Sequence, residues 1–193
     1  MTDEIFADIV TRQFGAALEM LRNAIARCPD DVWLRRDPRE APFWQHAVHV
    51  LFYTRLFFFD SMAAAAAAGT GGKIMKLIGL PLKDTSEGEL NRMAATIGYT
   101  GLTEASFTAP RTLTKDEALA LLEETGSTFR TAMQQMRSPG AADAPNPMPW
   151  MRGTRAELLL YSLRHVHQHL GRLHSMLGRA GVKVDWIGGL PTM

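Results

Sequence analysis

The feature that most constrains the fold of this 193-residue chain is the helical spacing of apolar residues in four long segments. In the first segment, residues 3–27, apolar side chains recur every three or four positions, as on the buried face of an amphipathic helix. These side chains are Ile5, Ile9, Phe14, Leu18, Leu21 and Ile25. The alternation of apolar and polar residues that marks a half-buried strand is scarce. The sequence therefore predicts an all-α fold.

The second helix is delimited by proline and glycine. Pro42 suits the first turn of a helix, which we expect to run to Ala68 and to stop at Gly69. Residues 28–42, which come before this helix and are rich in proline, predict a loop.

Two capping boxes open the remaining long helices. The sequences TKDE at 114–117 and TRAE at 154–157 each place Thr three residues before Glu, so each side chain can bond the backbone N–H of the other residue. We expect the fourth helix to end at Gly178 or Gly181, since glycine commonly follows a helix.

The stretch between the second and third helices is the least regular part of the chain. Residues 70–113 predict a long crossover that carries one short extra helix near 86–97. The length of the chain fits one domain of ordinary size. We therefore predict a four-helix bundle in which residues 1–193 form a single domain.

Composition narrows the classes of function. The formal net charge is +1, and no run of Lys or Arg is longer than two, which argues against a nucleic-acid partner. Arg55 and Asp60 interrupt the most apolar stretch too soon for a membrane span, and residues 1–14 lack the pattern of a signal peptide. The single cysteine, Cys28, excludes an internal disulfide. We expect a cytoplasmic protein that binds neither nucleic acid nor membrane.

The six histidines lie in only two of the predicted helices. They are His46 and His49 in the second helix and His165, His167, His169 and His174 in the fourth. At about 100° per residue, the apolar face of the fourth helix contains His169 and has His165, one turn earlier, at its edge. His49 lies near the middle of the apolar face of the second helix. We therefore expect His49, His165 and His169 to point into the bundle.

Three inward imidazoles are costly to bury unless each has a partner. One divalent metal ion would bind all three, and three neutral nitrogens with an open fourth position form a catalytic geometry of zinc. Nickel, iron and copper also accept imidazole. The alternative is three ordinary core histidines, each with a hydrogen bond. We expect His46, His167 and His174 at the surface or beside the ligands.

Two segments carry a resemblance to a known family. PFWQHAVHVLFYTRLFFFD and ELLLYSLRHVHQHLGRLHSMLGRAG resemble the DinB/YfiT-like family of metal-binding four-helix bundles. The family has one His on its second helix and an H-x-x-x-H motif on its last long helix. The resemblance implies that these ligands fall on His49, His165 and His169. It also implies an up-down-down-up bundle, often a homodimer, that binds zinc or nickel.

The same resemblance implies a class of chemistry. Relatives are S-transferases and isomerases that use low-molecular-weight thiols such as bacillithiol or mycothiol, or are described as metal-dependent hydrolases. In both cases the ion lowers the pKa of a bound thiol or water. The chain departs from the family motif at Gln168, where many members have His, and at Arg172, which replaces Gln. These departures affect the expected substrate more than the expected metal.

Three further residues are candidates for binding a small-molecule substrate or reacting with it. Tyr53 lies one turn after His49 and Tyr161 one turn before His165, so each hydroxyl is a candidate weak acid or hydrogen-bond donor, or else a core tyrosine. Arg172 is the candidate for binding a substrate carboxylate. The predicted function is thus a metal-dependent thiol S-transferase or hydrolase. The alternative is a non-catalytic metal-binding or stress-response bundle whose histidines are structural or vestigial.

Overall fold

The computed structural model describes residues 2–37, 40–59, 64–65, 112–148 and 151–187. Helices form its regular structure, and this part of the chain contains no strands beyond isolated bridges. The helices are α1 (Asp3–Arg27), α2 (Asp30–Leu34), α3 (Phe43–Leu56), α7 (Lys115–Gln135) and α8 (Arg155–Arg179). The predicted all-α fold is confirmed.

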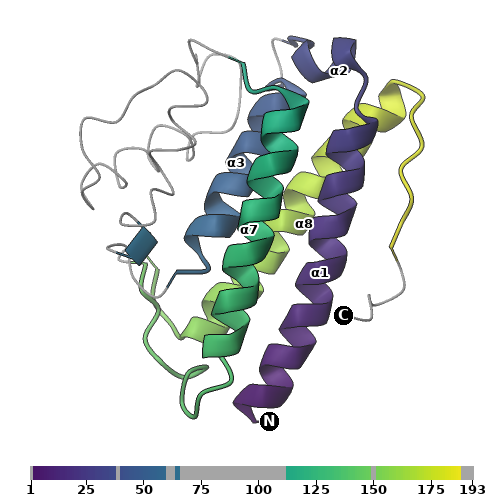
Figure 1. Cartoon of the computed structure of the whole chain (residues 1–193). Helices are drawn as coiled ribbons and strands as arrows, with labels where there is room; N and C mark the ends of the chain where they lie inside the picture. The colour runs from purple at the N-terminus through teal and green to yellow at the C-terminus, as the bar shows by residue number, and fades with distance from the viewer. Residues whose placement is uncertain (1, 38–39, 60–63, 66–111, 149–150, 188–193) are drawn as a thin grey trace, which may run out of the picture.

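The four long helices lie side by side, with α1 and α8 running in one direction and α3 and α7 in the other (Figure 1). This is the expected up-down-down-up order. Helix α1 packs on α7 and α8, and α3 packs on the same two helices from the opposite side of the core. The largest fully buried side chains are Phe14, Phe43, Phe52, Phe57, Phe58, Leu21, Ile25, Leu51 and Leu56.

Both predicted capping boxes are present. The Thr114 hydroxyl accepts a hydrogen bond from the Glu117 backbone, and the Glu117 carboxylate accepts one from the Thr114 N–H at 3.0 Å. Thr154 and Glu157 repeat the arrangement at the start of α8. After the end of α8, Gly181 has a φ of +76°, the left-handed conformation that glycine adopts without strain. These local sequence signals correctly located the starts of α7 and α8 and the end of α8.

The predicted end of the second helix is wrong, because α3 ends at Leu56 and not at Ala68. The guanidinium of Arg155, the first residue of α8, lies against the chain just after α3. It donates hydrogen bonds to the carbonyls of residues 57, 58 and 59 at 3.1, 2.7 and 2.7 Å. These bonds satisfy carbonyls that a continuing helix would have used internally, and so they stabilise the break. Residues 64 and 65 are helical again.

The predicted loop 28–42 contains the short helix α2. Asp30 and Asp31 occupy its first turn, where negative charge is favourable. Trp33 is buried, and its indole N–H donates to the Leu113 carbonyl at 2.7 Å. Burial of this side chain therefore holds the turn in helical form. The expected crossover over 70–113, except for its last residues, and its short helix near 86–97 lie outside the described residues.

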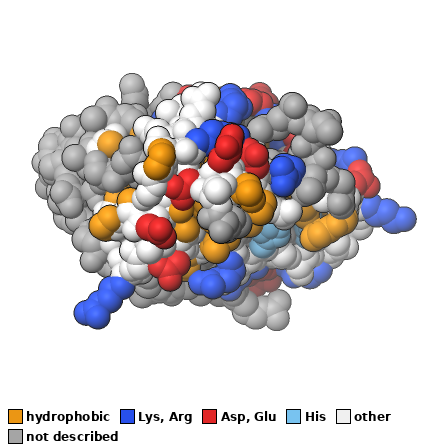
Figure 2. Space-filling model, turned by 90° about the horizontal axis from the view of Figure 1, so that it is seen from below, with side chains coloured by type: hydrophobic (Ala, Val, Ile, Leu, Met, Phe, Trp, Pro, Cys, Tyr) orange, Lys and Arg blue, Asp and Glu red, His pale blue; other side chains and the backbone are white. Residues whose placement is uncertain are grey.

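Charged side chains of both signs lie beside one another at the lower end of the molecule (Figure 2). There, Arg137 pairs with Asp8 at 2.5 Å and lies 3.7 Å from Glu4, which ties the region after α7 to the start of α1. Among the described helices, none combines the length and the apolar character that crossing a bilayer requires.

Candidate metal centre

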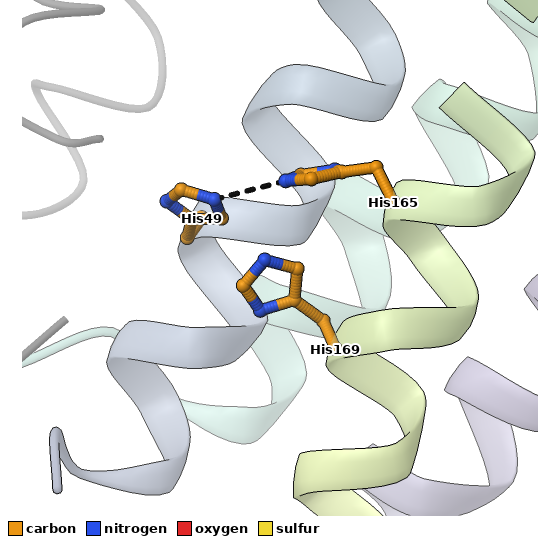
Figure 3. A group of neighbouring side chains, drawn as sticks. All are labelled: His49, His165 and His169. Carbon is orange, nitrogen blue, oxygen red and sulfur yellow. Dashed lines mark hydrogen bonds between the residues drawn. The ribbon is translucent and has the colours of Figure 1, made fainter. Parts of the chain in front are cut away.

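The packing of α3 against α8 brings together three histidines that are far apart in the sequence. His49 lies in the middle of α3, and His165 and His169 lie one turn apart on α8. Because the two helices are antiparallel neighbours, the side chains meet across their interface. Figure 3 shows the three rings pointing toward one another.

The three rings are close enough to share one ion. A candidate ligand nitrogen on each ring lies within 4.8 Å of those on the other two. The Nε2 atoms of His49 and His165 are 3.1 Å apart. Two nitrogens bound to a tetrahedral zinc ion at 2.0–2.1 Å would be separated by roughly 3.3 Å. The donor set and its spacing therefore fit a divalent metal ion without a large rearrangement.

Burial keeps the imidazoles of His165 and His169 neutral. His49 and His169 are buried, and His165 is half-buried. Loss of solvation, with a smaller contribution from the neighbouring His49, lowers the pKa of His165 to about 3 and that of His169 to about 2. The neutral imidazole is the form that binds a metal ion. Protons therefore compete weakly for the nitrogens of His165 and His169 at neutral pH.

His46, which we expected at the surface or beside the ligands, is fully buried with 0% exposure and lies beside one of the ligand candidates. The physical reason is that every residue of α3 is buried, so the helix has no solvent side. Burial lowers the pKa of His46 to about 4, with a contribution from the charge of Arg172. The ring centroid of His46 lies 5.9 Å from that of His169. Helical periodicity alone gave no signal of this burial.

The other two histidines lie apart from the cluster. His167 is exposed, as expected, and its Nδ1 lies 2.9 Å from the carbonyl oxygen of Leu163. His174 is half-buried, and burial lowers its pKa. Within the described ranges, no hydrogen-bond partner lies near its Nε2. The sequence therefore placed His167 correctly and placed His174 too far outside the core.

Two tyrosines flank the cluster along the same interface. Tyr53 is buried, with its ring centroid 4.8 Å from that of His49 and 5.6 Å from that of His165. Tyr161 is half-buried, and its ring lies nearly parallel to that of His165 with centroids 6.2 Å apart. The guanidinium of Arg164 lies 5.3 Å from the centre of the Tyr161 ring. Both tyrosines thus lie next to ligand candidates, as predicted.

Arg172 follows His169 by almost one turn and is exposed. Its spacing from His165 and His169 places it on the same face of α8, and its positive charge contributes to the lowered pKa values of His46 and His169. Among the described residues, it has no hydrogen-bond or ion-pair partner. The guanidinium is therefore available to an anionic group near the cluster.

Two other features lie away from the histidines. A cavity of about 500 Å³ lies between α2 and the start of α7, lined in part by Trp33 and Leu113. Cys28 is buried, and burial raises the pKa of its thiol to about 12. The thiol is therefore protonated at neutral pH and is not a nucleophile.

Comparison with known proteins gives a family. The DinB superfamily matches residues 13–173, a range that contains all three clustered histidines. No curated protein and no solved structure matches the chain significantly.

Proposed function

Because this chain belongs to the DinB superfamily, we propose that it is a metal-dependent enzyme in which His49, His165 and His169 bind one divalent ion, zinc or nickel. The observation that supports this most directly is the convergence of three largely buried nitrogens within 4.8 Å. When bound, such an ion lowers the pKa of a coordinated thiol or water and so supplies a nucleophile at neutral pH. The proposed reaction is S-transfer from a low-molecular-weight thiol, or hydrolysis, on a small electrophile.

The protein supplies the binding and orientation of the reactants. His49 and His169 are buried, whereas His165 is half-buried, so the centre borders solvent on the His165 side. We propose that the reactants enter from that side. Tyr161, also half-buried and parallel to His165, is the better placed tyrosine for donating a hydrogen bond to a substrate. The buried Tyr53 packs on His49 and helps to fix its ring.

Arg172 is the proposed binding group for a carboxylate or another anionic group of the substrate or thiol. It lies on the helix face of His165 and His169 and is exposed. A guanidinium binds a carboxylate through two parallel hydrogen bonds. The small molecule handled by the enzyme is therefore proposed to be an anion. The expected homodimer remains a prediction, which light scattering of the purified protein would check.

Metal analysis of protein purified without a histidine tag tests the proposal. We expect close to one zinc or nickel ion per chain in the wild type and almost none in His169→Ala. The matched control is His167→Ala, which removes an exposed histidine from the same helix and should keep the metal. A wild-type protein without stoichiometric metal would contradict the proposal.

Activity measurements separate an enzyme from a non-catalytic metal protein. Electrophilic substrates are screened with glutathione, bacillithiol or mycothiol and without any thiol. Turnover that needs both the thiol and His169 supports S-transfer, whereas turnover that needs His169 alone supports hydrolysis. Stoichiometric metal without turnover of any substrate would favour the structural role. Replacing Arg172 with Met should raise KM for anionic substrates, whereas Arg12→Met, which changes an exposed arginine of α1, should not.

A further inference from the structure

Two neighbouring histidine rings, that of His46 beside the three-histidine cluster and that of His169 within it, have buried nitrogens without a hydrogen-bond partner in the described part of the chain. Both ring nitrogens of His46 are buried and unbonded, and so is Nδ1 of His169. The two rings are neighbours across the α3–α8 interface, with centroids 5.9 Å apart and planes inclined at 50°. Because an unsatisfied buried polar group is destabilising, each of these rings gains from any partner that it acquires.

The Nδ1 of His169 lacks a hydrogen bond that the Nδ1 of His167, two residues earlier on α8, has. The Nδ1 of His167 lies 2.9 Å from the carbonyl oxygen of Leu163, one turn earlier on the helix. The Nδ1 of His169 makes no such bond to its own helix. Its ring is turned toward α3, where it contacts the rings of His46 and His49.

Metal binding would fix the position of the proton on His169. If Nε2 binds the ion, Nδ1 carries the proton, and a metal-bound imidazole almost always donates that N–H to an acceptor. A neutral imidazole has one acceptor nitrogen, and His46 is the histidine outside the cluster whose ring contacts His169. With an N–H···N distance of about 3 Å, the two centroids would lie roughly 5 Å apart. The observed 5.9 Å is therefore within a small side-chain rotation of a hydrogen bond.

We propose that His46 is a positioning residue of the metal centre, whose acceptor nitrogen takes the Nδ1–H of His169 and holds that ring in the orientation that binds the ion. This inference rests on the proposed metal binding by the cluster. His46 is not itself a ligand, because the described ligand atoms that gather within 4.8 Å belong to His49, His165 and His169.

Metal affinity of full-length variants tests this role. We expect His46→Phe, which keeps an aromatic ring but removes the acceptor, to weaken Co²⁺ and Zn²⁺ binding by about 10- to 100-fold. His46→Gln, whose amide oxygen can accept the same bond, should recover most of that loss. His174→Phe is the matched control, since His174 is a partly buried histidine of α8 without a ring contact to the cluster, and its metal affinity should equal that of the wild type.

The outcomes distinguish this inference from the proposed function. A wild-type protein that binds no metal would overturn both. Wild-type affinity in a folded His46→Phe, or equal losses in His46→Phe and His46→Gln, would overturn the role of His46 and leave the metal centre intact.

If the His46→Phe variant fails to fold, a second measurement, made on the wild type, tests the same inference. In metal-loaded protein with ¹⁵N-labelled histidine, the Nδ1–H of His169 should exchange slowly and show a coupling across the hydrogen bond to a nitrogen of His46. Absence of that coupling, or a nitrogen shift that shows His46 bound to the metal, would overturn the inference.

Discussion

The interior of the bundle between α1 and α7 is mostly apolar, whereas the interior between α3 and α8 is lined with imidazoles. On the first side, the rings of Phe14, Phe58 and Phe129 contact one another with centroids 5.0 to 5.2 Å apart. On the second side, the rings in contact are those of His46, His49, His165 and His169. Burial of aromatic rings stabilises a fold, whereas burial of unbonded imidazoles destabilises it. The α1–α7 side therefore supports the stability of the fold, whereas the α3–α8 side holds the three histidines that could bind a metal ion.

Lowering the pH should destabilise the α3–α8 side far more than the α1–α7 side, and this is the largest effect that we expect. His46, His165 and His169 have pKa values of about 4, 3 and 2 in the folded protein, against 6.5 when unfolded. Below pH 6.5 the unfolded chain binds more protons, so stability falls with pH by up to about 1.4 kcal/mol per unit for each histidine. For His46 this loss is complete near pH 4. Urea unfolding of the metal-free protein between pH 7.5 and 4.5 measures the effect.

A free energy of unfolding that stays constant between pH 7.5 and 4.5 would contradict this difference between the two sides. Replacing the exposed His167 with Gln provides the control and should leave the pH dependence unchanged, because its ring is open to solvent in both states.

Truncating the aromatic cluster should give the next largest effect. Phe14 is fully buried between Phe58 and Phe129, and Phe14→Ala should lower the free energy of unfolding by about 3–5 kcal/mol. Its metal content per folded chain should stay at the wild-type value, since α1 carries no member of the cluster. Loss of metal from the folded variant would show that the two sides are not independent.

Removing Arg155, whose guanidinium bonds the carbonyls just after α3, should have a smaller effect. Arg155→Met keeps most of the apolar stem but leaves the carbonyls of residues 57–59 without their donor. We expect a loss of about 2–3 kcal/mol in urea unfolding, because unsatisfied buried acceptors are costly. The control is Arg179→Met, which changes an exposed arginine at the other end of α8 and should cost under about 1 kcal/mol.

The same two regions show what the sequence could and could not predict. The capping boxes and the i, i+4 pair His165 and His169 are local patterns, and the structure has them as expected. The end of α3 depends on Arg155, whose guanidinium bonds the Phe57 carbonyl 98 positions away along the chain. The burial of His46 depends on neighbours that cover α3 on every side. Neither long-range effect has a signature in residue spacing.

The smallest expected effect is the change in the free energy of unfolding caused by His169→Leu. It tests the difference between the two sides most directly, because its sign should change when metal is added. In metal-free protein, His169→Leu removes a buried imidazole with an unbonded Nδ1 and should raise the free energy of unfolding by about 1 kcal/mol. With zinc at a hundred times its dissociation constant, the wild type gains about 2.7 kcal/mol and the variant does not. The order of stability therefore reverses, which urea unfolding with EDTA and with zinc would show. If His169→Leu is less stable than the wild type both with EDTA and with zinc, the imidazole stabilises the fold itself, and the proposed role of the α3–α8 interface in binding a ligand is contradicted.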